Sequence, residues 1–374
     1  MSVLTPPASQ SATATAAAPV RPVHSFDEFS PLVEVVVGDV TGARIPTDPD
    51  RSRWLNLHPG LDAETASSPG GMFDRRVIAE TEEDLEELAD TLRRLGVTVH
   101  RPDPIDHAQR FSTPHGWSAD GFYSYCPRDL TLIAGNAIIE TPSPMRARYF
   151  ETRALARMFQ ARMLAGSAWI SAPKPRLGDE LYPSGPDGAP RLGETEPAFE
   201  AANVLRCGID LFYLVSGSGN EMGRVWLETT VEQLAPAGCK FRVHPVRGVY
   251  AGTHIDSTIS LLRPGLVLLN PERVTAETIP DPLRRWDVIW CPPMAGPDAP
   301  PDALSSPWVG MNLLMVSPDL AIVDADQREL IAALERHRIE VIPLRLRHAR
   351  TLGGGFHCTT LDLVRQAPAI DYFT

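Results

Sequence analysis

A recurring order of local patterns runs along this sequence: two short apolar runs joined by a turn, then a helical segment, then another strand. Apolar runs bounded by turn residues indicate strands, and apolar residues three or four positions apart indicate a helix. The order returns at intervals of roughly 60 to 80 residues, longer than the repeats of common solenoid proteins. It is seen in hairpin 130–139 with helix 151–164, strand 211–215 with helix 223–234 and strand 241–244, hairpin 259–269, and hairpin 312–323 with helix 326–336 and strand 340–343.

A strand–helix–strand unit near the start of the chain extends this pattern. Residues 31–39 predict a strand, residues 80–95 a helix that ends at Gly96, and residues 97–100 a second strand. A closed ring of ββαβ modules fits the order, and an open, doubly wound sheet is the alternative. Both are α/β folds.

The domain organisation follows from length and composition. The chain has 374 residues, of which 43% are hydrophobic, so it can bury a large core. Residues 1–25 are rich in Ala, Ser, Thr and Pro, a composition typical of a disordered tail. We therefore expect a tail over 1–25 and one folded domain over 26–374.

Charge and cysteine usage exclude several classes of function. A formal net charge of −12 argues against nucleic acid or an anionic membrane as a partner, and no apolar run is long enough for a transmembrane helix. The five cysteines are widely spaced and form no CxxC pair. This pattern predicts free thiols in the cytoplasm rather than a disulfide framework or a zinc site.

The segment that ends at Cys358 is the first candidate for chemistry. Three glycines, Gly353 to Gly355, precede Phe356, His357 and Cys358, and glycines let a backbone approach a ligand closely. A cysteine thiolate is a strong nucleophile when positive groups lie near it. A buried structural cysteine after a flexible turn is the alternative.

A histidine and an acid two residues apart form the second candidate. If the segment is extended, His254 and Asp256 point to the same face, where the acid could bind a cation while the histidine moves protons. A polar strand face on the surface would show the same alternation.

Two further acids stand next to strand signals. Asp129 precedes the 130–139 hairpin and could bind a guanidinium group or simply form a turn. Glu200 lies among small residues that would leave room beside it, although most glutamates are solvated.

Together these segments resemble the L-arginine amidinotransferases. The likeness is greatest to the bacterial branch that acts on inosamine phosphates, which are aminocyclitols, and lower to the glycine amidinotransferases. It extends in family order from about residue 31 to the C-terminus. The segments that carry it include CPRDLTLIAGNAIIETP (126–142), SAPKPRLGDELY (171–182), FEAANVLRCGIDLFYLVS (199–216), THIDSTI (253–259), RPGLVLLNPERV (263–274), SSPWVGMNLLMV (305–316) and LGGGFHC (352–358).

The resemblance implies a fold and an oligomeric state. It implies a pentein-type α/β propeller of five ββαβ modules with pseudo-fivefold symmetry, formed by residues 26–374 as one catalytic domain. It also implies a homodimer.

The resemblance also implies a role for each candidate residue. Cys358 matches the nucleophile, His254 the general acid and base, and Glu200 the acid that partners this histidine. The guanidinium of L-arginine would be bound by Asp129 and Asp256. The rest of the donor would be held by Arg273, Ser305 and Ser306.

These roles describe transfer of an amidino group through a covalent intermediate on Cys358, with release of L-ornithine. No cofactor or metal is required. The partners would be L-arginine and a small-molecule amine, either an aminocyclitol phosphate or another natural-product amine. Well-known amidinotransferases have Asp where this chain has Glu200, whereas arginine deiminases of the same superfamily have Glu at a comparable place. A deiminase-like hydrolase is therefore the alternative, and an arginine-binding protein without turnover is a third class.

Overall fold

Seven small sheets form the framework of the computed structural model, which describes residues 20–47, 51–56, 70–234, 240–296, 300 and 303–374. Five of the sheets have three strands and share one topology: the middle strand pairs antiparallel with the first and parallel with the third. In sheet order they are β7 (Thr131–Ala134), β8 (Ala137–Glu140) and β9 (Ala168–Ser171); β10 (Val204–Cys207), β11 (Asp210–Leu214) and β12 (Arg242–Val246); β13 (Ile259–Arg263), β14 (Leu266–Leu269) and β15 (Asp287–Trp290); β16 (Leu314–Ser317), β17 (Leu320–Asp324) and β18 (Glu340–Leu344); β19 (Thr360–Arg365), β1 (Leu32–Val37) and β4 (Thr98–His100).

A parallel pair needs a crossover between its strands, and helices supply it in four of the five sheets. The helices are α2 (Arg75–Arg94), α3 (Ala156–Leu164), α4 (Glu221–Leu234) and α5 (Arg328–Arg336). In the sheet of β13 to β15 the short 3-10 helix η7 (Asp281–Arg285) takes this place. The remaining strands form the two-stranded sheets β2 (Arg44–Ile45)–β3 (Gly71–Met72) and β5 (Phe111–Ser112)–β6 (Ser118–Ala119), and α6 (Ala349–Leu352) is a further short α-helix.

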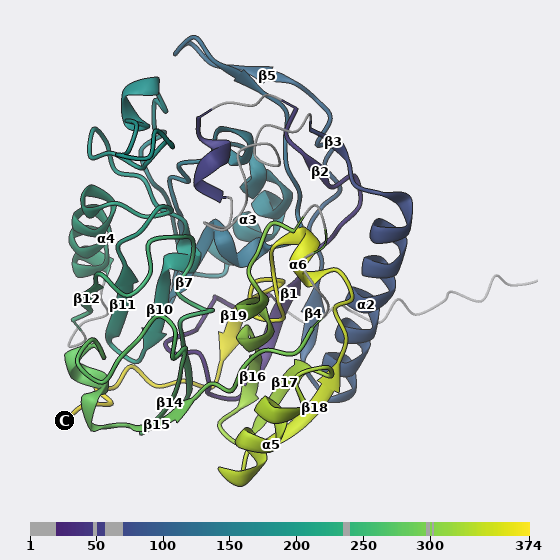
Figure 1. Cartoon of the computed structure of the whole chain (residues 1–374), viewed down its shortest axis with the longest axis vertical. Helices are drawn as coiled ribbons and strands as arrows, with labels where there is room; N and C mark the ends of the chain where they lie inside the picture. The colour runs from purple at the N-terminus through teal and green to yellow at the C-terminus, as the bar shows by residue number, and fades with distance from the viewer. Residues whose placement is uncertain (1–19, 48–50, 57–69, 235–239, 297–299, 301–302) are drawn as a thin grey trace, which may run out of the picture.

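Strands from the first and last parts of the described chain pair in the fifth sheet, where β19 runs antiparallel to β1 (Figure 1). This pairing completes a set of five ββαβ modules, each with its own sheet. The sequence prediction of a ring of such modules is confirmed, and the open doubly wound sheet is wrong, because the strands form separate sheets and not one continuous sheet.

Local signals explain most of the elements and their differences from prediction. Helix α2 starts at Arg75, five residues before the predicted start, because the Asp74 side chain accepts a hydrogen bond from the Arg76 backbone N–H and caps the helix. Its apolar stripe, which includes Leu85, Leu88 and Leu92, is buried. The predicted helix 151–164 begins as the 3-10 helix η4 (Glu151–Leu155) before it continues as α3.

A buried network of charged side chains joins several modules. Arg206 on β10 donates to Glu28 from the N-terminal segment and to Asp362 on β19. Arg128, just before β7, donates to the other oxygen of Asp362 at 2.6 Å. All four side chains are at most 6% exposed. Because each charge faces an opposite charge, this network can exist inside the protein.

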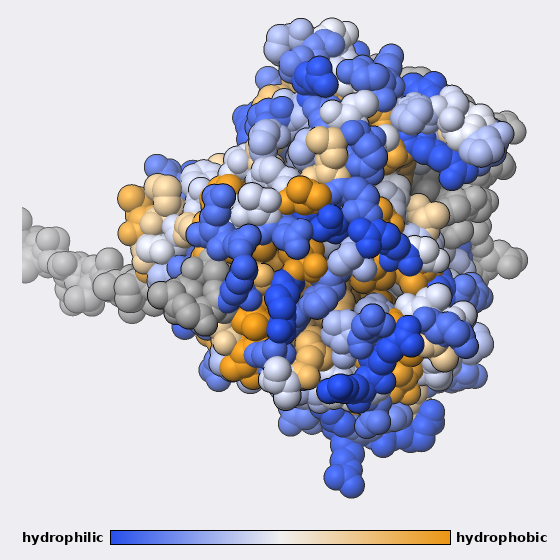
Figure 2. Space-filling view, turned by 90° about the vertical axis from the view of Figure 1, so that its left-hand side faces the viewer, coloured by the Kyte–Doolittle hydropathy of each residue, from blue (hydrophilic) through white to orange (hydrophobic). Residues whose placement is uncertain are grey.

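The outer surface is mainly polar. On the face shown in Figure 2, hydrophilic side chains dominate and hydrophobic ones form small patches between them. No described helix has the length and apolar character needed to cross a membrane. Of the predicted tail, residues 1–19 lie outside the described part of the chain, whereas Val23 and Ser25 are buried and Ser25 pairs with Gly135. Packing therefore begins a few residues before Phe26.

Candidate active site

Cys358 lies in the loop between α6 and β19 and is 3% exposed. Asn312 fixes this loop: its Oδ1 accepts hydrogen bonds from the backbone N–H groups of His357 and Cys358 at 2.9 and 3.0 Å. Its Nδ2 donates to the Cys358 Sγ at 3.2 Å. One side chain from the segment before β16 therefore sets both the backbone and the thiol of the candidate nucleophile.

The triglycine makes room for this arrangement. Gly353 has a left-handed backbone, with φ of 82°. A Cβ on Gly354 would lie 2.5 Å from the Cys126 Sγ, and one on Gly355 would lie 2.7 Å from the Cys358-binding residue Asn312. Gly353 is thus needed for its backbone conformation, and Gly354 and Gly355 are needed because neighbouring atoms leave no space for a Cβ.

His254 is held in an uncommon conformation beside the thiol. Its φ is 62°, although it is not a glycine, and its backbone N–H donates to the Ser218 Oγ. Its Nε2 lies 2.6 Å from Glu200 Oε2. The segment 254–256 is therefore a turn and not the extended piece considered from sequence, yet His254 and Asp256 both reach the surroundings of Cys358.

Glu200 is completely buried, so the interpretation as a solvated acid is wrong. Besides His254, it accepts hydrogen bonds from the Ser143 Oγ at 2.7 Å and from Arg148 at 3.4 Å. Burial alone would raise its pKa, but the charge of Arg148 and the contact with His254 outweigh burial and lower the pKa to about 2. Glu200 is thus an anion that supports a protonated His254.

Asp129 ends the short 3-10 helix η2 (Pro127–Asp129) and is 1% exposed. Its Oδ2 accepts a hydrogen bond from Arg148 at 2.8 Å, while no described residue hydrogen-bonds its Oδ1. Burial raises the pKa of Asp129, and the opposing charges of His254 and Arg148 offset this effect only in part.

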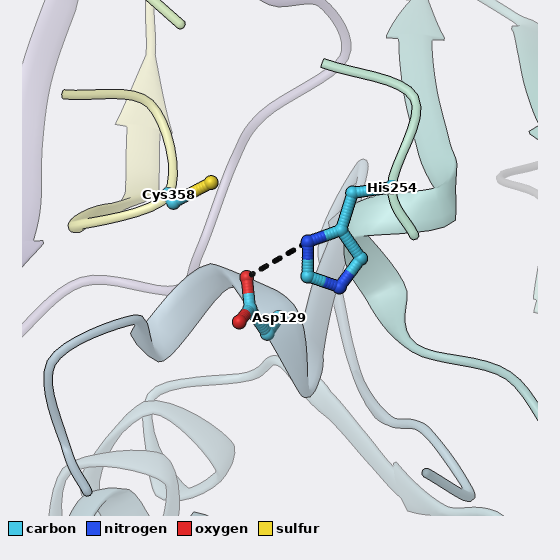
Figure 3. A group of neighbouring side chains, drawn as sticks. All are labelled: Asp129, His254 and Cys358. Carbon is cyan, nitrogen blue, oxygen red and sulfur yellow. Dashed lines mark ion pairs between the residues drawn. The ribbon is translucent and has the colours of Figure 1, made fainter. Parts of the chain in front are cut away.

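Asp129, His254 and Cys358 come from three modules and point into a common space (Figure 3). Their functional atoms all lie within 4.8 Å of one another, and His254 Nδ1 is 3.9 Å from Asp129 Oδ1. For His254, burial would lower the pKa, but the charge of Asp129 and the contacts with Cys358 and Glu200 raise it well above its ordinary value. The same three groups are of the types that can hold a metal ion.

Asp256 approaches the thiol from another side. Its Oδ2 lies 3.2 Å from the Cys358 Sγ and 2.9 Å from His357 Nδ1. Burial would raise its pKa, but the contact with His357 and the charges of His357 and His254 lower it to about 2. The structure therefore brings four predicted residues, Cys358, His254, Asp129 and Asp256, into one cluster, with Glu200 behind His254.

The surroundings of Cys358 disfavour a free thiolate. Hydrogen bonding with Cys126, burial and the negative charge of Asp256 raise the pKa of the Cys358 thiol well above its ordinary value, although the contact with His254 works in the opposite direction. A cation that enters between the carboxylates would reverse this balance and favour the thiolate.

The three residues predicted to hold the remainder of a donor lie next to one another. Arg273 donates to the Ser306 Oγ at 3.1 Å and lies over the Tyr250 ring, 3.6 Å from its centroid. Ser305 lines the same cavity as Asp129 and His254. The other walls of this cavity include Arg53, Tyr123 and Leu304.

Three residues that contribute to the site were not predicted. Arg148 is fully buried and joins Asp129 to Glu200, Asn312 fixes the Cys358 loop, and His357 contacts Asp256. Arg148 and Asn312 stand within the segments 146–155 and 305–316, and His357 precedes the candidate nucleophile. Their neighbours in space come from other modules, and for this reason no local pattern revealed them.

Comparison with known proteins assigns the chain to a class of enzymes. No protein-family model matches the chain. It is 51% identical over 347 residues to inosamine-phosphate amidinotransferase 1 of Streptomyces griseus, covering 92% of this chain and 97% of that protein. It is 35% identical to mitochondrial glycine amidinotransferase of Gallus gallus, covering 94% of this chain and 85% of that protein.

Solved structures agree with these relatives. An inosamine-phosphate amidinotransferase from Streptomyces griseus superposes with a TM-score of 0.86 at 48% identity, over 95% of this chain and all of that chain. An amidinotransferase of saxitoxin biosynthesis from Microseira wollei gives 0.84 at 34% identity, over 94% and 100%. The protein is therefore an enzyme that transfers amidino groups. The chain belongs to the amidinotransferase family and is more similar to the inosamine-phosphate branch than to the glycine branch.

A more distant neighbour shows the fold alone. The dimethylarginine hydrolase DDAH from Pseudomonas aeruginosa superposes with a TM-score of 0.57 at 14% identity, over 88% of this chain and 99% of that chain. The pentein-type fold implied by the sequence is confirmed.

Proposed function

We propose that this enzyme takes the amidino group from L-arginine, carries it on Cys358 and delivers it to an amine on an aminocyclitol phosphate or a related natural product. The observation that supports this proposal is the cluster itself. One thiol, one histidine and two carboxylates meet in a buried space, and each is oriented by a further side chain. The relatives named for inosamine phosphate suggest the acceptor class.

The donor is a cation, and the site is suited to bind one. A guanidinium group stays protonated at neutral pH and carries its charge over several N–H donors. Asp129 and Asp256 can accept hydrogen bonds from these donors and direct the central carbon towards the Cys358 Sγ. Arg273 with Ser305 and Ser306 would hold the carboxylate and amino group at the other end of the donor.

The first half-reaction forms a bond between sulfur and carbon. The bound cation lowers the pKa of Cys358, whose thiol proton passes to solvent, and the thiolate attacks the guanidinium carbon. A protonated His254 donates its proton to the leaving nitrogen as the C–N bond breaks, and L-ornithine departs. The amidino group stays on sulfur as a cation between the two carboxylates.

The second half-reaction reverses these roles. The acceptor amine attacks the same carbon, His254 takes the proton of the amine, and Cys358 leaves as a thiolate. The order of events predicts ping-pong kinetics. Glu200 keeps the imidazole oriented through both halves by its contact with Nε2. A cytoplasmic location remains a prediction of the cysteine pattern, and a homodimer remains a prediction of the family resemblance.

Intact-mass measurement tests the covalent step. Incubation with L-arginine alone should add the mass of one amidino group to the chain, and Cys358→Ala should abolish this adduct. Added aminocyclitol phosphates or amines should discharge it, which identifies the acceptor at the same time. Steady formation of citrulline or urea without an amine would support the hydrolase alternative. Absence of both the adduct and turnover would contradict the proposal.

A further inference from the structure

The three side chains in Figure 3 have the composition and spacing of a metal site as well as of a catalytic cluster. Cys358, His254 and Asp129 supply one thiol, one imidazole and one carboxylate, and their ligand atoms lie within 4.8 Å of one another. In a tetrahedral zinc site with ligand distances of about 2.0 to 2.3 Å, neighbouring ligand atoms are about 3.3 to 3.7 Å apart. The 3.9 Å between His254 Nδ1 and Asp129 Oδ1 is close to this value.

The outer contacts of His254 and Asp129 leave one atom of each facing the common space. Glu200 binds His254 through Nε2, which leaves Nδ1 on the side of Asp129 and Cys358. Arg148 binds Asp129 through Oδ2, and the buried Oδ1 has no hydrogen-bond partner among the residues that the structure describes. A carboxylate behind a histidine and a cation behind a ligating carboxylate are the outer contacts that orient ligands in metal sites.

We propose that Asp129, His254 and Cys358 bind one Zn²⁺ ion, and that the bound ion inhibits amidino transfer. Zinc binds thiolate and imidazole ligands more readily than calcium or magnesium does. Three protein ligands leave a fourth position for water. When the metal binds, the thiol proton of Cys358 and the Nδ1 proton of the protonated His254 both pass to solvent. The thiolate and the Asp129 carboxylate then balance the two charges of the ion.

Inhibition follows from shared atoms. A metal bound to the Cys358 Sγ occupies the lone pair that nucleophilic attack requires. A metal bound to His254 Nδ1 blocks the nitrogen that faces the reacting groups. Zinc and the cationic donor should therefore exclude each other. The test of this metal site does not depend on which donor the enzyme uses, because metal binding can be measured without any turnover.

Cobalt provides the direct test, because Co²⁺ is coloured and usually accepts zinc ligands. The full chain, freed of metal with a chelator, should develop a near-ultraviolet thiolate-to-cobalt band and visible bands of tetrahedral Co²⁺ at one equivalent, and Zn²⁺ should remove both. Cys358→Ala should lose the thiolate band, whereas Cys291→Ala, which alters a buried cysteine outside the cluster, should keep it. Absence of the thiolate band in the unaltered chain, or its persistence in Cys358→Ala, would overturn the proposal.

A pair of carboxylate variants identifies the oxygen ligand. Asp129→Asn should weaken Zn²⁺ binding by at least the roughly 10- to 100-fold that loss of an outer contact costs in metal sites. Asp256→Asn changes the other carboxylate near the thiol and should weaken it much less. The reverse ranking, or loss of the thiolate band in Cys126→Ala, would show that a different ligand set binds the metal. Restoration of amidino transfer by a chelator after zinc inhibition should accompany these results.

Discussion

The side chain of Glu200 decides how the histidine of the site is oriented. It reaches His254 at 2.6 Å even though the sequence resemblance placed a shorter acid in other family members at this position. Burial and the contacts with Ser143 and Arg148 fix the longer side chain in place. The additional methylene is therefore accommodated without loss of the carboxylate–imidazole contact.

Replacement of Glu200 by Gln should slow formation of the amidino adduct by about 10²- to 10⁴-fold, as expected when the charge that orients a catalytic histidine is removed. The shape is retained, but the amide cannot stabilise the protonated imidazole. Single-turnover mass measurements with L-arginine report this rate. Ser143→Ala is the matched control, because it removes only one hydrogen bond to the same carboxylate. Equal rates for Glu200→Gln and the unaltered enzyme would contradict the role given to Glu200.

Asn312 offers a test of the charge around the thiol. In Asn312→Asp the oxygen that accepts from the backbone of residues 357 and 358 is retained, while the N–H donor to the Cys358 Sγ is lost and a negative charge is added. The pKa of Cys358, already raised, should rise further. Each additional pKa unit lowers the thiolate fraction, and hence alkylation by iodoacetamide at neutral pH, about tenfold.

The comparison variant is Asn312→Ala, which takes the acceptor from the buried Cys358 backbone N–H and leaves the His357 N–H only its 3.4 Å bond to the backbone oxygen of residue 312. It should lower the free energy of unfolding by about 1–3 kcal/mol, measured by denaturant unfolding. If Asn312→Asp alkylates as fast as the unaltered protein, Asn312 does not influence the thiol.

At the scale of elements, the glycine loop shows how a short segment fixes the site. A Cβ added at Gly354 would lie 2.5 Å from the Cys126 Sγ and 3.1 Å from the Cys358 Cβ. Gly354→Ala should therefore displace Cys358 and lower the rate of adduct formation by about 10²-fold, the loss typical of a misplaced reacting group. The double variant Gly354→Ala with Cys126→Ala should recover part of the rate, because it removes the sulfur from this space.

The control for this prediction is Gly248→Ala. Gly248 has a positive φ, 72°, which Gly354 does not have, but a Cβ there would meet no atom of the described residues within 4 Å. Gly248→Ala should therefore introduce backbone strain but leave the rate of adduct formation unchanged. If the double variant is no faster than Gly354→Ala, the contact with Cys126 is not the reason for the glycine.

Elements formed by neighbouring residues could be predicted from sequence, whereas pairings of distant segments could not. The hairpins near 130–139 and 312–323 and the helix within 223–234 were predicted because their turn residues and periodicities are local. The strand β19 was not predicted, because its partner β1 lies more than 300 residues away in the chain. Ring closure therefore came from the family resemblance and from recurrence of modules rather than from any local pattern.

The same distinction applies to the candidate site. Cys358 and His254 stood out because a glycine run and an alternating His and Asp are visible in a few residues. Arg148 was not predicted, since an arginine in the segment 146–155 gains its role only when Asp129 and Glu200 converge on it. Roles were assigned to Arg273, Ser305 and Ser306 only through the resemblance, because no local pattern marks a group that binds the far end of a substrate.

For the whole molecule, the buried charges that join the modules also determine its response to acid. Burial would raise the pKa of Glu28, but Arg206, His357 and Arg128 hold it well below its ordinary value. The pKa of Asp362 is lowered in the same way, because the charges of Arg128, Arg365 and Arg206 outweigh the effect of burial. Asp256 and Glu200, which belong to the candidate site, have pKa values of about 2. The buried network between the modules and the candidate site thus both depend on carboxylates that stay ionised.

These shifts predict how stability changes with pH. In the unfolded chain, Asp and Glu take up protons near pH 4, at pKa values of about 3.9 and 4.3, whereas the folded protein takes them up only at lower pH. The stabilisation is therefore fully present above about pH 4.5 and is lost as pH falls towards about 2. Each such group adds about 1.4 kcal/mol per pH unit to the slope of the unfolding free energy in this window.

Urea unfolding between pH 5 and 2 should therefore show a steep fall in the free energy of unfolding, with a slope that corresponds to several protons. Asp256→Asn should lower the slope by about one proton, because one depressed carboxylate is removed without a large change of shape. Asp187→Asn, which alters an exposed carboxylate paired with Arg191, should leave the slope unchanged. The fall in unfolding free energy at low pH comes from buried groups, so added salt should alter its slope little. A slope that disappears in salt would instead assign the acid sensitivity to surface charges.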